Sequence, residues 1–156
     1  MSRYLSLFNS PGGVASLPLT LMRVAIGLFF FASGFNKVFV PASQMMMLET
    51  ITEAGIPFPA LMAVFVASCE TLFGLLLAVG LLSRFSALLL TIISLVALVT
   101  VGIHHIPAGI NMLTWYSWLL YLPEPLYILI LAMIVVQGSG PLSIDRIIAQ
   151  RLTRSS

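Results

Sequence analysis

Charged residues are scarce in this sequence: only 8% of its 156 residues are Asp, Glu, Lys or Arg. Soluble domains carry roughly 25% charged residues, so a chain with 60% hydrophobic residues is expected to be an integral membrane protein. Its seven cations and five anions give a net charge of +2 and form no basic run. The lipid bilayer is therefore the first expected partner, and nucleic acid is not expected to be one.

Cysteine is almost absent, and the familiar cofactor motifs are missing. Cys69 is the single cysteine, so no disulfide can form within the chain. His104 and His105 are adjacent, so their side chains diverge, and no Cys, Asp or HExxH pattern stands nearby to complete a metal site. No GxGxxG, CxxCH or P-loop occurs either. The sequence predicts no metal ion and shows no cradle for a soluble cofactor.

Long apolar runs dominate what is present. Backbone groups inside a bilayer must bond to one another, so such runs are expected to be helices. Four runs each approach the ~20 residues that cross the hydrocarbon. They are residues 17–38, 60–82, 85–103 and 118–137. We therefore predict an all-α fold: a single membrane domain over residues 1–156, built as a bundle of four transmembrane helices.

The connections between the runs differ in length and character. Only Ser83 and Arg84 join the second run to the third, which predicts a tight helical hairpin. The first long connection repeats apolar residues at helical spacing, which predicts a short interfacial helix over about 42–54. The connection before the last run carries Trp115 and Trp118, which are typical of a membrane–water interface. We expect this segment to cap the bundle.

An even number of spans places both termini on the same side of the membrane. The hairpin between the second and third runs lies on that side, whereas Lys37 lies at the other surface. The cations on the side of the termini are Arg3, Arg84, Arg146, Arg151 and Arg154. By the positive-inside rule, both termini are predicted to be cytoplasmic, including the tail over residues 138–156.

Three ionisable residues fall inside the predicted spans. Arg23 is six residues into the first run, about 9 Å deep at ~1.5 Å per residue. Glu70 lies near the middle of the second run, and Glu124 about a third of the way into the fourth. Because a central arginine costs ~2.5 to 3.5 kcal/mol, each charge needs a partner. The simplest pairing is a buried cluster of all three, either as a tie between helices or as a proton or substrate site.

Small residues accompany these charges. On the first helix, Gly27 and Gly34 share one face with Arg23 and Lys37. On the second helix, a stripe of small residues runs beside Glu70, so we predict that the two helices pack closely. The stripe consists of Ala63, Ala67, Thr71, Gly74 and Ala78.

Four polar residues are candidates for the outer rim of the intramembrane site. Asn36 and Lys37 end the first run, and His104 and His105 follow the third. For Lys37 alone the sequence favours anchoring at the interface, and for the histidines it favours helix capping or an interfacial position. A histidine there could also exchange protons near neutral pH.

Taken together, these elements resemble the DoxX family of small bacterial membrane proteins, from about residue 23 to residue 148. The resemblance implies a multi-pass protein of the bacterial inner (cytoplasmic) membrane. Gly138-Ser139-Gly140 departs from the family's usual Gly-Pro-Gly, which affects only a turn. The residues that carry the resemblance are Arg23, Gly27, Gly34, Lys37, Gly55-Ile56-Pro57, Glu70, Gly74, Gly80, Arg84 and the stretch GSGPLSID over residues 138–145.

The resemblance also implies a link to redox chemistry, through quinone-coupled thiosulfate oxidation and membrane complexes that manage oxidative or thiol stress. It favours a quinone-associated subunit of a membrane oxidoreductase complex, with a quinone as cofactor and a membrane or peripheral redox protein as partner. One alternative is a non-catalytic assembly or accessory protein. Another is a small proton-coupled transporter, which ranks lower because Arg23 would neutralise a site for cationic substrates. The sequence is also compatible with a homo-oligomer.

Overall fold

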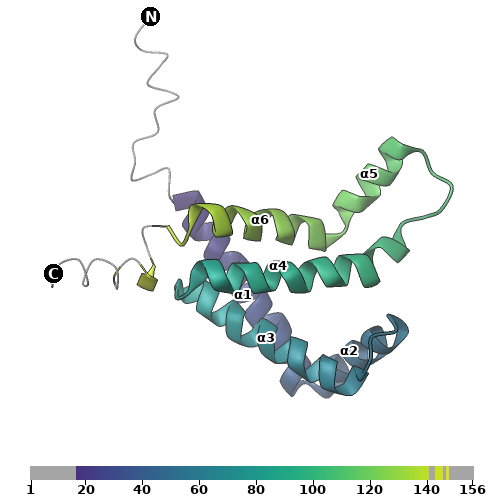
Figure 1. Ribbon diagram of the computed structural model, residues 1–156, viewed down its shortest axis with the longest axis horizontal. Coiled ribbons are helices and arrows are strands. Elements are labelled where there is room, and N and C mark those ends of the chain that lie inside the picture. Colours follow the sequence, from purple (N-terminus) through teal and green to yellow (C-terminus); the bar gives the residue numbers. More distant parts are fainter. Residues whose placement is uncertain (1–16, 141–142, 146, 148–156) are drawn as a thin grey trace, which may run out of the picture.

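The computed structural model describes residues 17–140, 143–145 and 147, and every regular element in these residues is a helix. Figure 1 shows their arrangement. In chain order the elements are α1 (Leu17–Phe39), α2 (Pro41–Glu53), α3 (Pro59–Val79), α4 (Ser83–Thr100), the short 3-10 helix η2 (Gly102–His105), α5 (Met112–Tyr121) and α6 (Pro123–Gln137). The prediction of an all-α fold is confirmed for this part of the chain.

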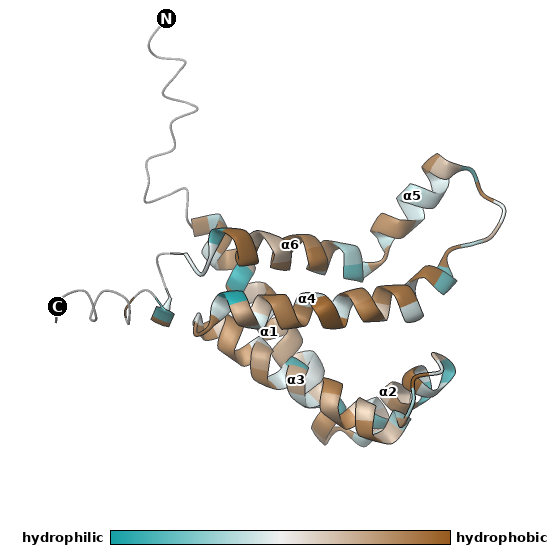
Figure 2. Cartoon of the chain, in the orientation of Figure 1, coloured by the Kyte–Doolittle hydropathy of each residue, from teal (hydrophilic) through white to brown (hydrophobic). Residues whose placement is uncertain are grey.

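Three helical segments within the described residues are long and apolar enough to cross a membrane. They are α1, α3, and α4 continued through η2 to His105. Their bounds agree with the first three predicted runs to within a few residues. Apolar colouring covers most of α3, α4 and α6 in Figure 2, whereas much of the polar colouring falls near helix ends. The protein is therefore a multi-pass membrane protein.

The fourth predicted span, residues 118–137, is not one straight helix. α6 begins only at Pro123, and α5 is bent by 72° from it. Proline lacks a backbone N–H and disfavours a helical conformation in the residue before it. Leu122 is extended, with φ −70° and ψ 140°. The 15 residues of α6 measure about 22 Å at ~1.5 Å per residue, so α5 and α6 make a fourth span only as a bent pair.

α1 and α3 pack against each other as an antiparallel pair. A β-carbon added to Gly27 would lie 2.5 Å from the backbone nitrogen of Ala78, and one added to Gly34 would lie 2.5 Å from that of Thr71. Gly74 of α3 approaches the α1 backbone at Phe31 just as closely. No side chain fits in these gaps. The prediction that small residues bring these two helices together is therefore confirmed.

α4 and α6 lie side by side and form a second layer over α1 and α3 (Figure 1). The core lies between the layers, where Leu77 of α3, Leu90 of α4 and Leu131 of α6 are fully buried. Ile26 and Phe30 of α1 belong to the same cluster. Many large apolar side chains remain on the outside of the helices, which suits a surface that faces lipid.

The turn between α3 and α4 is held by a residue from the C-terminal segment. The Asp145 carboxylate accepts hydrogen bonds from the backbone N–H of Leu82 at 2.8 Å and of Ser83 at 3.0 Å. The backbone N–H of Asp145 in turn donates to the Gly80 carbonyl at 3.0 Å. Asp145 therefore satisfies N–H groups that the first turn of α4 leaves without intrahelical partners. We call this end of the bundle, around residues 80–82, the turn end.

The remaining connections agree with the sequence only in part. α2 matches the predicted short helix over 42–54 and buries only Ile51, while its position at a membrane surface stays a prediction. α5 does not cap the bundle, because it buries no residue and extends away from α4 and α6 in Figure 1. We call the end that holds α2 and η2 the α2 end.

The predicted cytoplasmic location of the termini also stays a prediction. Four of the five cations on which it depends, Arg3, Arg146, Arg151 and Arg154, lie outside the described residues or have no described side chain. Arg84 lies at the turn end, as expected, and donates to the Val136 carbonyl at 3.3 Å.

Candidate ligand cavity at the α2 end

A cavity of about 500 Å³ lies among α1, α2, α3, α4 and the first turn of α6. Its walls are mostly apolar: Met46 and Met47 of α2 contribute, as do Ile92, Ile93 and Val96 of α4. Cavities of this size hold ligands of ordinary small-molecule dimensions, and apolar walls with a few polar groups are typical of ligand sites. The charged residues that line it are Lys37, Glu70 and Glu124.

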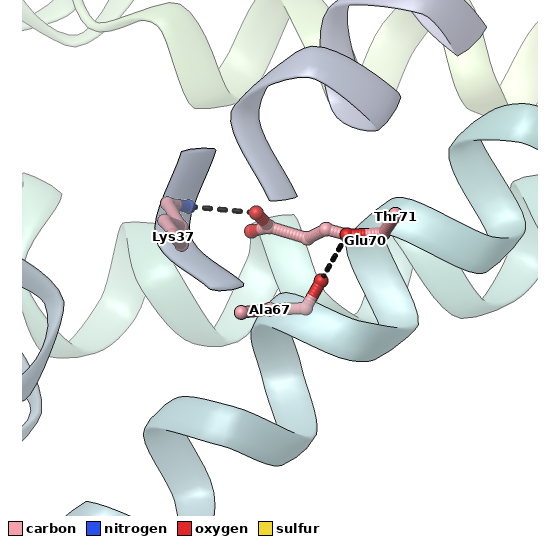
Figure 3. A network of polar contacts seen from close by, with 4 residues as sticks. All are labelled: Lys37, Ala67, Glu70 and Thr71. Carbon is pink, nitrogen blue, oxygen red and sulfur yellow. Dashed lines mark hydrogen bonds and ion pairs between the residues drawn. The ribbon is translucent and has the colours of Figure 1, made fainter. Parts of the chain in front are cut away.

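An ion pair between α1 and α3 forms the polar centre of this cavity. The Lys37 ammonium lies 2.7 Å from Oε2 of Glu70 and donates a hydrogen bond to it, as Figure 3 shows. The Glu70 side chain is only 8% exposed, whereas that of Lys37 is 26% exposed. Below Glu70, the Thr71 hydroxyl donates to the Ala67 carbonyl of its own helix. Lys37 therefore turns inward and neutralises a buried carboxylate, while its anchoring at an interface stays a prediction.

Arg23 lies far from this pair, so its predicted pairing with Glu70 is wrong. Its guanidinium donates to the backbone carbonyls of Leu77 at 2.8 Å and Ala78 at 2.9 Å. The last carbonyls of a helix have no intrahelical partners and carry partial negative charge, so they suit a cation. Asp145 binds the backbone of the same turn. Arg23 is thus a buried structural residue of the turn end.

The register of α1 on α3 explains this exchange of partners. Gly27 faces Ala78 and Gly34 faces Thr71, so α1 residues before Gly27 meet the end of α3. Arg23 precedes Gly27 by one helical turn and therefore reaches the α3–α4 turn. Glu70 precedes Thr71 on α3, and Lys37 follows Gly34 by about one turn of α1. The contact of Gly34 with Thr71 therefore brings Lys37 next to Glu70. The sequence contained a signal for this pairing, since Lys37 shares its face with Gly34.

Glu124 lies on the same cavity but joins no ion pair among the described residues. It stands in the first turn of α6, between Pro123 and Pro125. Its Oε2 atom is buried and has no hydrogen-bond partner within the part of the chain that the structure describes. Two residues of the predicted cluster, Glu70 and Glu124, therefore line the cavity, and Arg23 does not. Lys37 lines the cavity as well.

Only two of the four residues predicted for the outer rim line the cavity. Asn36 and Lys37 line the cavity. His104 and His105 are exposed on η2 and do not contribute to its walls. Nδ1 of His105 lies 3.0 Å from the Val101 carbonyl, which agrees with the capping interpretation. Within the described residues, no group of three His, Cys, Asp or Glu side chains is arranged to hold a metal ion.

A family model described as DoxX matches residues 18–103, which is more than half of the chain. The chain belongs to the DoxX family. The matched segment includes α2, α3, α4 and nearly all of α1, so it covers Lys37, Glu70 and every wall of the cavity except Glu124. Neither a curated protein nor a solved structure matches the chain.

Proposed function

We propose that this DoxX protein is a membrane subunit of a redox system and binds a quinone-like molecule in the cavity at the α2 end. The observation that carries the proposal is an ion pair inside a mostly apolar cavity of about 500 Å³. A quinone has the matching chemistry, because its ring and tail are apolar while its carbonyl oxygens accept hydrogen bonds.

Lys37 and Asn36 are the residues that would hold a quinone carbonyl. An ammonium has three N–H donors, and a single hydrogen bond, to Glu70, occupies the Lys37 ammonium among the described residues. The Asn36 amide, one residue earlier, lines the same cavity. Glu70 would hold Lys37 in place, and Met46 and Met47 would adapt their flexible side chains to the ring.

The chain would contribute binding and orientation rather than electrons. Reduction of a quinone to a quinol requires electrons and protons, and the sequence offers no cradle for a soluble electron carrier. A membrane or peripheral redox protein would therefore supply or remove the electrons. In the inner membrane of a bacterium, a lipid-soluble ligand could enter the cavity from the bilayer.

Equilibrium binding tests this function. Protein in nanodiscs is titrated with a short-chain alkyl benzoquinone, and the dissociation constant is compared with that of a variant carrying both Lys37→Met and Glu70→Gln. Loss of a charged donor should raise the dissociation constant about tenfold or more. Arg84→Met is the matched control, because it removes a cation at the turn end, and it should bind like the wild type.

Equal affinity of the wild type and the double variant would show that the ion pair does not hold the quinone. A wild type without saturable binding would instead favour the accessory role, in which the buried charges only stabilise helix packing.

A further inference from the structure

The charges that line the cavity do not balance. Lys37 and Glu70 neutralise each other at 2.7 Å, and Glu124 is the third charged residue on the walls. One oxygen of the Glu124 carboxyl group is buried without a hydrogen-bond partner among the described residues. Buried polar groups are nearly always hydrogen-bonded, so an unpartnered oxygen on a cavity wall indicates a partner that binds there.

The protein surroundings of this oxygen are mostly apolar. Oε2 of Glu124 faces the bare α-carbon of Gly102, where an added β-carbon would lie 3.6 Å from it. The same added carbon would lie 3.1 Å from Leu98 and 3.5 Å from Leu122. Leu98, Leu122 and Gly102 therefore offer no side-chain hydrogen-bond donor on this side of the carboxyl group.

Two of the hydroxyl groups that line the cavity are already in use. Thr100 of α4 donates to the Val96 carbonyl at 2.8 Å, and Thr50 of α2 donates to the Met46 carbonyl at 2.8 Å. Tyr127, one turn further along α6, donates no hydrogen bond to Oε2 of Glu124 in the described part of the chain. Across the cavity, the Lys37 ammonium donates to Glu70 and has no described contact with Glu124. A molecule bound in the cavity is therefore a candidate partner for the Glu124 oxygen.

We infer that the ligand of this cavity presents a hydroxyl group to Glu124, so that the reduced quinol fits the cavity better than the oxidised quinone. A hydroxyl both donates and accepts, so it satisfies the carboxyl group whether or not that group carries a proton. A quinone carbonyl only accepts, so it cannot satisfy an ionised carboxylate. The inference rests on the proposed function, because it names which form of the proposed ligand the site prefers.

Three probes with the same ring and alkyl tail test the inference. They are an alkyl benzoquinone, the corresponding hydroquinone, and the dimethyl ether of that hydroquinone, which keeps the reduced ring but has no donor. Their dissociation constants are measured without oxygen, on the full chain in nanodiscs. We expect the hydroquinone to bind about tenfold more tightly than either other probe, the value of one hydrogen bond to a charged group.

Two substitutions at Glu124 assign the preference to this residue. Glu124→Leu removes the acceptor and should abolish the difference among the probes. Glu124→Gln offers an NH2 donor beside its carbonyl acceptor, so it can also bind the quinone carbonyl and should reduce the difference between hydroquinone and quinone. Thermal unfolding of both variants is measured in parallel. We expect no loss of stability in Glu124→Leu, because the buried oxygen has no partner to lose.

The outcomes separate the inference from the function on which it rests. Equal, saturable binding of all three probes by the wild type would overturn the inference and leave quinone binding intact. A hydroquinone preference that persists in Glu124→Leu would overturn the role of Glu124. Absence of binding by every probe would overturn both the inference and the proposed function.

Discussion

Replacing Gly74 with leucine is expected to separate α1 from α3 and to lower the free energy of unfolding by about 3 kcal/mol or more. A β-carbon at this position would overlap the α1 backbone at Phe31 and Phe30, and backbone atoms cannot move aside as a flexible side chain can. Gly27 and Gly34 make equally close contacts along the same interface, so the helices cannot accept the larger side chain by sliding. Reversible unfolding in mixed micelles measures the loss.

Ala60→Leu is the matched control for this substitution. It introduces the same side chain into the same helix, at an exposed position, and should change the free energy of unfolding by less than about 0.5 kcal/mol. Equal stability of the two variants would contradict the close α1–α3 packing.

Removing Lys37 is expected to lower the free energy of unfolding by a similar amount. Lys37→Met leaves the Glu70 carboxylate buried without its cation, and breaking a buried ion pair from one side costs about 3–5 kcal/mol. A second substitution, Glu70→Gln, removes the uncompensated charge and should restore most of the lost stability. The measurement is a double-mutant cycle, in which we expect a coupling energy of about 2 kcal/mol or more.

A second cycle between Arg23 and Glu70 is the control. Arg23 binds the carbonyls of Leu77 and Ala78 at the turn end, so its coupling to Glu70 should stay within about 0.5 kcal/mol. Strong coupling in this cycle and weak coupling between Lys37 and Glu70 would restore the partner assignment made from sequence.

Periodicity and composition predict most of the membrane architecture. The apolar runs correctly predicted the positions of α1, α3 and α4, and the small residues of α3 correctly predicted its packing against α1. The fourth run was predicted as one straight helix and is instead part of a bent pair, because a run of apolar residues contains no information on direction. The bend at Leu122 depends on Pro123, whose effect on the chain path is local and outweighs the hydropathy of the run.

The partners of the buried charges were harder to predict. Depth counted from the ends of apolar runs placed Arg23 near Glu70, but the contact register of two helices is set by where their small residues meet. The pairing of Gly27 with Ala78 moves Arg23 to the turn end and brings Lys37 to Glu70. The contact of Asp145 with the α3–α4 turn spans more than 60 positions in the sequence, and no local pattern reveals it.

The central claim is that the cavity at the α2 end, with its Lys37–Glu70 pair, is the ligand site. Photolabelling tests it most directly: a benzoquinone with a photoreactive group on its ring is irradiated with the protein in nanodiscs, and the labelled residues are mapped by mass spectrometry. The account predicts labels on the cavity walls, at Met46, Met47 or Ile92–Ile93, which excess unlabelled quinone suppresses. Labels confined to α5 or to the lipid-facing side of α3, without such competition, would contradict it.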